Sequence, residues 1–149
     1  MEIEKEIYNR KFENSHQKAV VNLLYTYGWI TNLLRLLLNK HNVTLQQYNI
    51  LRILRGHHPN PATINILKER MLDKMSDASR IVERLVQKDL VIRCVSDKDR
   101  RAVDILISQN GLDILQKLDT EISLKAMLSN NISEEEASTL SGLLDKMRG

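Results

Sequence analysis

The chain has 149 residues, of which 42% are hydrophobic but only 4% aromatic, and its formal net charge is +3 at pH 7. This length predicts a single domain, and an aliphatic composition is typical of a helical protein with a Leu- and Ile-rich core. The single cysteine excludes an internal disulfide and favours a reducing, cytoplasmic setting. The first residues lack the apolar stretch of a secretory signal. Polar residues interrupt the most apolar region, 20–38, so no membrane span is expected.

The first part of the chain predicts two helices after a polar arm. Residues 1–14 form the arm, with an extra helical turn in it, and a long amphipathic helix follows over 15–39. Thr44 and Gln47 then have the spacing of a capping box, which satisfies exposed backbone amides at a helix start. This pair predicts a second helix that ends near Gly56.

The next two helices form a predicted helix-turn-helix pair. Asn60 followed by Pro61 fits an N-cap and a first helical position, which predicts a third helix as far as about Met71. Ser76 is the predicted N-cap of a fourth helix over 76–88, because its hydroxyl can accept from amides of the first turn.

The helix over 76–88 is strongly amphipathic. Arg80 lies almost opposite its apolar face, and Arg side chains can bind guanine edges and phosphates. Any surface helix needs a polar face, however, so an ordinary amphipathic helix is the simpler interpretation of this segment alone. The apolar face consists of Ala78, Ile81, Val82, Leu85 and Val86.

A charged hairpin follows this helix and favours the DNA-binding interpretation over an ordinary amphipathic helix. Residues 90–95 and 103–107 have the β-branched, alternating pattern of short strands. The connection over 96–101 is too charged to be core, and its arginines could enter a narrow minor groove. A solvated turn is the alternative. A helix suited to the major groove beside a basic hairpin favours DNA binding.

The end of the chain predicts two more helices. One is expected from 109 to about 129, and Ser133 with Glu136 makes a capping box for the last. A minimal DNA-binding module needs neither helix, so their apolar stripes suggest a second burial partner. In the last helix the stripe consists of Leu140, Leu143, Leu144 and Met147.

Positive charge is concentrated in the middle of the chain. From Arg35 to Arg101 there are fourteen Lys and Arg against seven Asp and Glu, and no acidic residue lies between Glu13 and Glu69. A basic centre with acidic ends is typical of a polyanion-binding protein. This centre coincides with the predicted helix and hairpin.

The hairpin region resembles the multiple-antibiotic-resistance regulator (MarR) family. Asp99 and Arg101, with Ile107 and Ser108 after five further residues, resemble its D-x-R-x5-L-T signature. The strand over 90–93 resembles the family's "L-x-x-x-G-L-V-x-R" pattern.

The resemblance is strongest over 71–111 and extends weakly over nearly the whole chain. Gly111 falls where the family places a glycine after the hairpin, whereas Asp89 replaces a usual glycine. Asp tolerates the left-handed backbone that glycine would supply. The other departures are Ile-Ser in place of Leu-Thr and an atypical helix before 76–88.

The resemblance implies a mainly α fold with a small antiparallel β-hairpin wing. It implies one winged helix-turn-helix domain over 1–149, with a DNA-binding lobe at about 44–108. N- and C-terminal helices, at about 15–40 and 109–149, would join two copies as a homodimer that reads a palindrome. The alternative is an intramolecular helical cap on a monomer.

The DNA-binding roles implied for individual residues follow the same pattern. Arg80 is expected to contact a base or a central phosphate, Arg101 to enter the minor groove, and Arg100 to contact backbone phosphate. Asp99 is expected to orient a neighbouring arginine through a salt bridge, since phosphates repel a carboxylate. The other expected contacts are Ser76, Asp77, Ser79 and Arg84 of the recognition helix.

The resemblance also implies a small-molecule effector, such as an aromatic acid, in a cleft between the dimer helices and the DNA lobe. Three aromatic residues are candidates for lining it, although such residues at helical spacing are more often core. They are Tyr25, Trp29 and Tyr48.

Other reactive residues predict no chemistry. Cys94 in a hairpin strand is interpreted as a small packing residue, and His57 with His58 lacks a third metal ligand at useful spacing. No cofactor motif or nucleophile motif is found, so an enzyme is not expected.

Two functions therefore remain in view. The first is a ligand-responsive homodimeric transcription regulator. The resemblance implies that it is a repressor. The second is a winged-helix module that binds a partner protein through the same helix and wing. The second should expose apolar residues on the helix over 76–88, and none is expected there.

Overall fold

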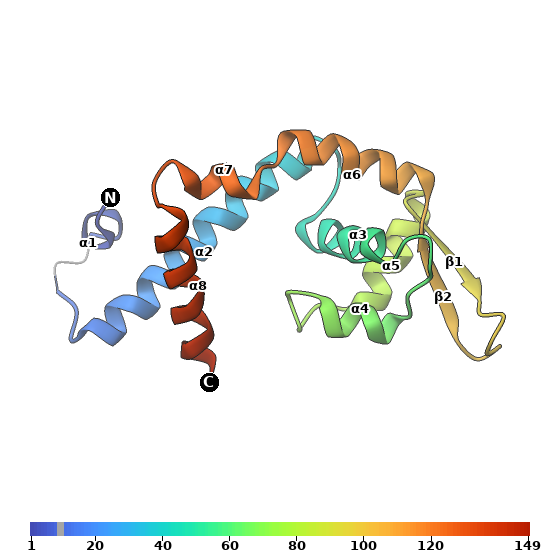
Figure 1. Cartoon of the computed structure of the whole chain (residues 1–149), viewed down its shortest axis with the longest axis horizontal. Helices are drawn as coiled ribbons and strands as arrows, with labels where there is room; N and C mark the ends of the chain where they lie inside the picture. Colours follow the sequence, from blue (N-terminus) through green and yellow to red (C-terminus); the bar gives the residue numbers. More distant parts are fainter. Residues whose placement is uncertain (9–10) are drawn as a thin grey trace. The chain divides into compact units, whose positions relative to one another are not determined.

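The computed structural model describes residues 1–8 and 11–149, which fall into two compact units, Met1–Leu115 and Gln116–Gly149. Asn9 and Arg10, in the predicted polar arm, lie outside the described residues. The predicted fold class is confirmed: the chain is mainly helical with one two-stranded antiparallel sheet (Figure 1). The elements are α1 (Ile3–Glu6), α2 (Ser15–Asn39), α3 (Leu45–His57), α4 (Ile64–Arg70), α5 (Ala78–Gln87), β1 (Val91–Val95), β2 (Val103–Ile107), α6 (Gln109–Glu121), α7 (Leu124–Ser129) and α8 (Glu134–Arg148).

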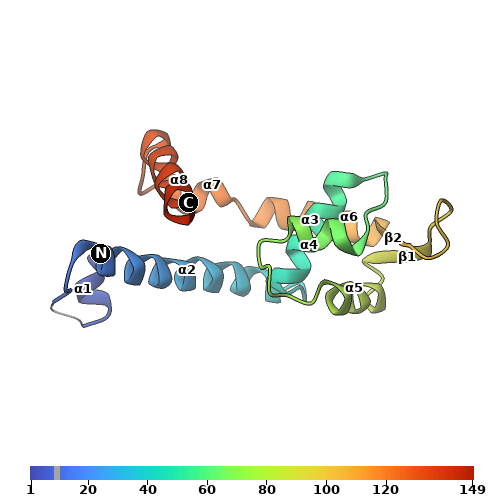
Figure 2. The ribbon, with the colours of Figure 1, turned by 90° about the horizontal axis from the view of Figure 1, so that it is seen from below.

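Helices α3, α4 and α5 pack together with the hairpin to form a lobe in the first unit. Its core is aliphatic, as the composition predicts. Figure 2 shows α2 leading into this lobe as one continuous helix. The fully buried side chains of the unit include Leu38, Ile50, Leu51, Leu54, Leu67, Met71, Leu85 and Ile105.

The wing is a ladder of five residue pairs, from Val91 opposite Ile107 to Val95 opposite Val103. Ala62 joins the sheet at one point, because its backbone N–H and C=O both pair with Ile105 at 2.9 Å. This pairing attaches the middle of β2 to the segment before α4.

The same pairing corrects the predicted start of the third helix. Helix α4 begins at Ile64 with Thr63 as N-cap, not at Pro61 after Asn60. Because Ala62 is extended and bonded to the sheet, the chain cannot turn into a helix until after it.

Two further helix boundaries differ from prediction. The N-cap of α5 is Asp77, whose carboxylate accepts from the Arg80 N–H, whereas the Ser76 hydroxyl donates to Asp73. The helix predicted over 109–129 is interrupted at Ile122, and Ser123 caps the separate helix α7 through the Ala126 N–H. In both cases a neighbouring side chain caps the helix: Asp77 caps α5 in place of Ser76, and Ser123 starts α7 as a separate helix.

The second unit holds the end of α6 with α7 and α8. The predicted capping box of Ser133 and Glu136 is present at the start of α8. Neither α7 nor α8 buries a residue, so the predicted apolar stripe of α8 remains exposed at Leu140, Leu143 and Met147. Within the described part of the chain, no helix combines the length and apolar character that crossing a bilayer requires.

Candidate nucleic-acid interface

The helix α5 presents one buried and one exposed face, as predicted. Ala78, Val82 and Leu85 are buried in the lobe. Arg80 and Arg84 are exposed on the outward side, together with Ser79 and the N-cap Asp77. Since the apolar face fixes the helix in the lobe, two guanidinium groups are held outward on a supported scaffold.

The turn before α5 is fixed by Asp73. Its carboxylate accepts from the Met75 N–H at 3.0 Å and the Ser76 hydroxyl at 2.7 Å, and these bonds lower the pKa of Asp73, that from Ser76 most. The Leu72 N–H donates to the Asn49 side chain at 2.9 Å. The entry to the recognition helix is therefore held by side chains of the lobe itself.

Two exposed apolar side chains in this turn were not anticipated. Leu72 is 87% exposed and Met75 is 93% exposed, directly before α5. They fall between the last buried residue of the preceding segment, Met71, and the first of α5, Ala78. A sequence signal did exist, because neither residue fits the apolar period of either helix.

Asp99 organises the tip of the wing. Its carboxylate accepts from the Arg101 backbone N–H at 2.9 Å, and its carbonyl accepts from the Ala102 N–H at 2.9 Å. Asp99 thus holds the backbone of Arg101, and the salt bridge expected from the sequence stays a prediction. Arg100 and Arg101 are both exposed.

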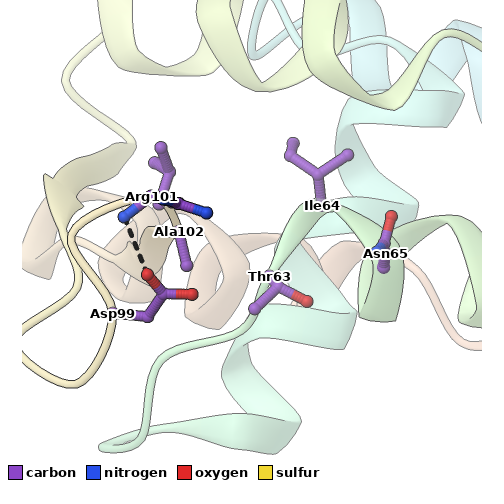
Figure 3. A pocket seen from close by; sticks show the side chains of 7 residues that line it. Thr63, Ile64, Asn65, Asp99, Arg101 and Ala102 are labelled. Carbon is purple, nitrogen blue, oxygen red and sulfur yellow. Dashed lines mark hydrogen bonds between the residues drawn. The ribbon is translucent and has the colours of Figure 1, made fainter.

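A hollow of about 380 Å³ lies between the wing and the start of α4. Figure 3 shows Asp99, Arg101 and Ala102 on one side of it and Thr63, Ile64 and Asn65 on the other. A hydroxyl, an amide and a guanidinium line the hollow together with the Asp99 carboxylate. The first three groups commonly contact phosphate, whereas the carboxylate repels it. Sequence reasoning missed Thr63 and Asn65, since only the pairing at Ala62 brings α4 beside the wing.

The three effector candidates have different environments. Tyr25 and Trp29 lie one turn apart on α2 and are partly exposed. The Tyr25 hydroxyl donates to Glu6 at 2.7 Å, which raises the pKa of Tyr25. Tyr48 is buried in the lobe, with the Arg52 guanidinium 5.6 Å from its ring centroid. Only the two on α2 are accessible from solvent.

Cys94 is exposed, so its interpretation as a packing residue is wrong. Beyond Val91, strand β1 extends past the core, and all four of its remaining side chains are exposed. Alternation along a strand buries a side chain only where something covers the sheet.

A three-helix lobe, an outward basic helix and a hairpin with arginines at its tip define a winged helix-turn-helix protein. Comparison with known proteins gives the family. A family model described as "MarR family" matches residues 41–102. The HTH-type transcriptional regulator SarZ from Staphylococcus aureus (strain USA300) is 31% identical over 105 residues, covering 69% of this chain and 68% of SarZ. The chain belongs to the MarR family, whose members are DNA-binding transcription regulators and not enzymes.

Solved structures agree with this assignment. A mutant MarR from E. coli complexed with operator DNA has a TM-score of 0.73 at 25% identity, covering 85% of this chain and 91% of that one. An organohalide-sensing regulator, RdhR-CbdbA1625, in its 2,4-dichlorophenol-bound form, has a TM-score of 0.76 at 23% identity, covering 94% and 86%. The family model and SarZ confirm the predicted family, and the two solved structures share its fold.

Proposed function

We propose that the protein is a homodimeric, ligand-responsive transcriptional repressor in the cytoplasm that reads a palindromic operator. Helix α5 would enter the major groove and wing residues 96–101 the adjacent minor groove. One observation carries the proposal: Arg80 and Arg84 face solvent on a helix whose opposite face is buried, beside a wing that exposes Arg100 and Arg101. Arginine is the commonest specific reader of guanine and a frequent phosphate contact.

Each residue has a role in this proposal. Arg80 contacts a base edge or a central phosphate, Arg101 enters the minor groove, and Arg100 contacts backbone phosphate. Asp99 positions Arg101 through the backbone bond described above. The remaining contacts to DNA come from Ser76, Asp77, Ser79 and Arg84 at the recognition helix.

The dimer would use the helices at about 15–40 and 109–149, outside the lobe at about 44–108. Exposed apolar side chains on α2 support this: Leu24 and Tyr27 are each 64% exposed, although isolated exposed apolar residues are ordinary. Helix α8 adds Leu143 and Met147. Burying such side chains between two copies would supply the free energy of association.

This part of the proposal is tested by Leu24→Glu. Sedimentation should show a dimer for the parent chain and a monomer for the variant, with helical content unchanged by circular dichroism. Two recognition helices then no longer act together, so operator affinity should fall far more than affinity for random DNA. A parent chain that sediments as a monomer would contradict the dimer.

The effector would be an aromatic acid or a similar small aromatic molecule, bound beside Tyr25 and Trp29. RdhR-CbdbA1625 supports this in its 2,4-dichlorophenol-bound form. Tyr48 contributes only if the lobe opens, because its ring is buried. Binding would change the separation of the recognition helices by favouring one conformation of the dimer.

Fluorescence anisotropy tests DNA recognition directly. A labelled duplex from upstream of the protein's own gene is titrated at two salt concentrations against a scrambled duplex. Salt-dependent binding that prefers the native duplex is expected. Equal weak binding to both would leave only a basic surface, and no binding at low salt would overturn the proposal.

One observation favours a second candidate, a module that binds a partner protein. The predicted marker, an exposed apolar residue on the helix itself, is absent from α5, but Leu72 and Met75 are exposed just before it. Replacement of both by Ser discriminates the two functions. Loss of a pulled-down partner with unchanged operator affinity would support the module, and loss of operator affinity would support DNA contact.

A further inference from the structure

Lys88 links two parts of the lobe that are distant in sequence. It is the C-cap residue of α5, and its Nζ donates to the Asn42 carbonyl at 2.5 Å and to Gln47 Oε1 at 3.1 Å. These acceptors lie at the junction between α2 and α3. A half-buried ammonium thus joins the end of the recognition helix to the connection between α2 and α3 and to the first turn of α3.

Both acceptors belong to well-defined backbone structures. Asn42 has a left-handed φ of 54°, which asparagine tolerates better than most residues, and its N–H donates to Asn39 at the end of α2. Gln47 is 3% exposed, and its Oε1 also accepts from the Thr44 N–H in the capping box of α3. Both acceptor residues are thus held by further hydrogen bonds, so a movement of α5 away from them would break the contacts with Lys88.

The opposite side of the same helix end is held separately. Asp89 has a left-handed φ of 56°, and its carbonyl accepts from the Ser108 hydroxyl at 2.7 Å. The Ser108 N–H donates to the Leu90 carbonyl at 3.1 Å. These bonds tie the end of α5 to the start of α6, whereas the side chain of Lys88 reaches toward α2.

The ammonium of Lys88 is poorly placed to bind DNA. Of its three N–H donors, two are already used within the lobe, and its side chain is partly buried. Only the third N–H could reach a phosphate while both of these bonds are kept. The basic charge counted at this position in the sequence is therefore structural.

We infer that Lys88 is a positioning residue that transmits the orientation of α2 to the recognition helix. The inference rests on the proposed function, in which the apolar face of α2 contacts a second copy. In such a dimer, Lys88 sets the angle and separation of the two recognition helices. It thereby determines how strictly the protein measures the spacing between operator half-sites.

Operators of altered spacing test this role. Lys88→Met removes the ammonium and keeps most of the stem, and Lys40→Met is the matched control, since it removes an exposed charge at the same end of α2. One base pair inserted between half-sites shifts them by roughly 3.4 Å and 35°. Lys88→Met should lose about tenfold in affinity for the native spacing, the size expected for a hydrogen-bonded charge. The fold-loss of affinity caused by the inserted base pair should be smaller for Lys88→Met than for the parent chain or for Lys40→Met.

An equal insertion penalty in all three proteins would overturn the positioning role. A loss of stability alone would lower binding at both spacings alike, so the ratio of the two affinities separates the explanations.

Amide hydrogen exchange without DNA tests the contact of Lys88 with Asn42 and Gln47 directly. This test does not depend on whether the parent chain binds an operator. Lys88→Met should speed exchange in both 42–47 and 84–90, whereas Lys40→Met should leave both segments unchanged. Unchanged exchange in Lys88→Met would overturn the inference. If the parent chain fails to distinguish operator from scrambled DNA, the proposed function fails, and exchange still decides whether the link exists.

Discussion

Helices α2 and α5 belong to the same unit but differ in how much of each is covered. Helix α2 has 25 residues and buries only Leu34 and Leu38, both near its end. Helix α5 has 10 residues and buries three. A helix in a globular protein gains most of its stability from packing, so α5 is stabilised by the lobe, whereas most of α2 is left uncovered by it. The difference separates residues that maintain the fold from residues available for association.

Truncation of a lobe residue should give the largest effect on stability. Leu51 is fully buried, and Leu51→Ala should lower the free energy of unfolding by about 2–5 kcal/mol through lost burial and a cavity. Urea unfolding followed by circular dichroism measures this. Leu24→Ala, on the exposed part of α2, is the control and should act mainly on dimer dissociation. If Leu51→Ala and Leu24→Ala lower the free energy of unfolding equally at low protein concentration, where the dimer is dissociated, the difference between the lobe and α2 is contradicted.

Two glycines, one packed against the lobe and one in α2, test the same difference between the lobe and α2. A Cβ on Gly111 would lie 2.3 Å from the Leu90 carbonyl oxygen and 2.7 Å from Ile107, so Gly111→Ala should destabilise the lobe by about 1–3 kcal/mol. A Cβ on Gly28, within α2, meets nothing within 4 Å. Gly28→Ala should stabilise the helix by about 0.5–1 kcal/mol, because alanine is the better helix former. Thermal unfolding of both variants checks the opposite signs, and equal signs would contradict this account.

The two arginine positions should differ in what they change on DNA. Arg80→Ala should cost about 1–3 kcal/mol of operator binding and relax preference at one base position. Arg101→Ala should weaken binding to many sequences and reduce the slope of affinity against salt by about one. Anisotropy with operator and random duplexes at several salt concentrations measures both. Equal loss on both duplexes for Arg80→Ala would make it a phosphate contact, and unchanged affinity for Arg101→Ala would remove the wing from the mechanism.

The smallest expected effect concerns the turn before α5. The Ser76 hydroxyl is the main cause of the lowered pKa of Asp73, so Ser76→Ala should raise that pKa toward its ordinary value of 3.8. Because the folded-state pKa is lowered, these bonds stabilise the chain above the ordinary pKa. That contribution is lost as pH falls through the folded-state value. Carboxyl-carbon NMR titration measures the shift, and an unchanged pKa would contradict the assigned cause.

The sequence predicted the elements whose signals are local. The capping boxes of Thr44 and Ser133, the two wing strands and the left-handed backbone at Asp89 are all present. The capping boxes and the Asp89 backbone depend on residues within a few positions of one another, and each strand is marked by its own β-branched, alternating pattern.

The errors have two causes. The starts of α5 and α7 were mispredicted because a neighbouring side chain supplies the cap, whereas the features below depend on contacts between distant segments. The start of α4 depends on the pairing of Ala62 with Ile105, which lie 43 positions apart and have no common local signal. The hollow beside Thr63 follows from the same pairing. The Lys88 contacts also join distant segments, and no periodicity marks a lysine as a structural donor.

The pairing of Ala62 with Ile105 also bears on how such a regulator can diverge. It anchors the wing at the middle of β2, whereas the side chains of the tip, 97–101, are exposed. Substitutions at 97–101 therefore replace exposed side chains and leave the buried core unchanged. The tip can acquire new DNA preferences, by natural selection or by grafting from another member of the family, at little cost to folding.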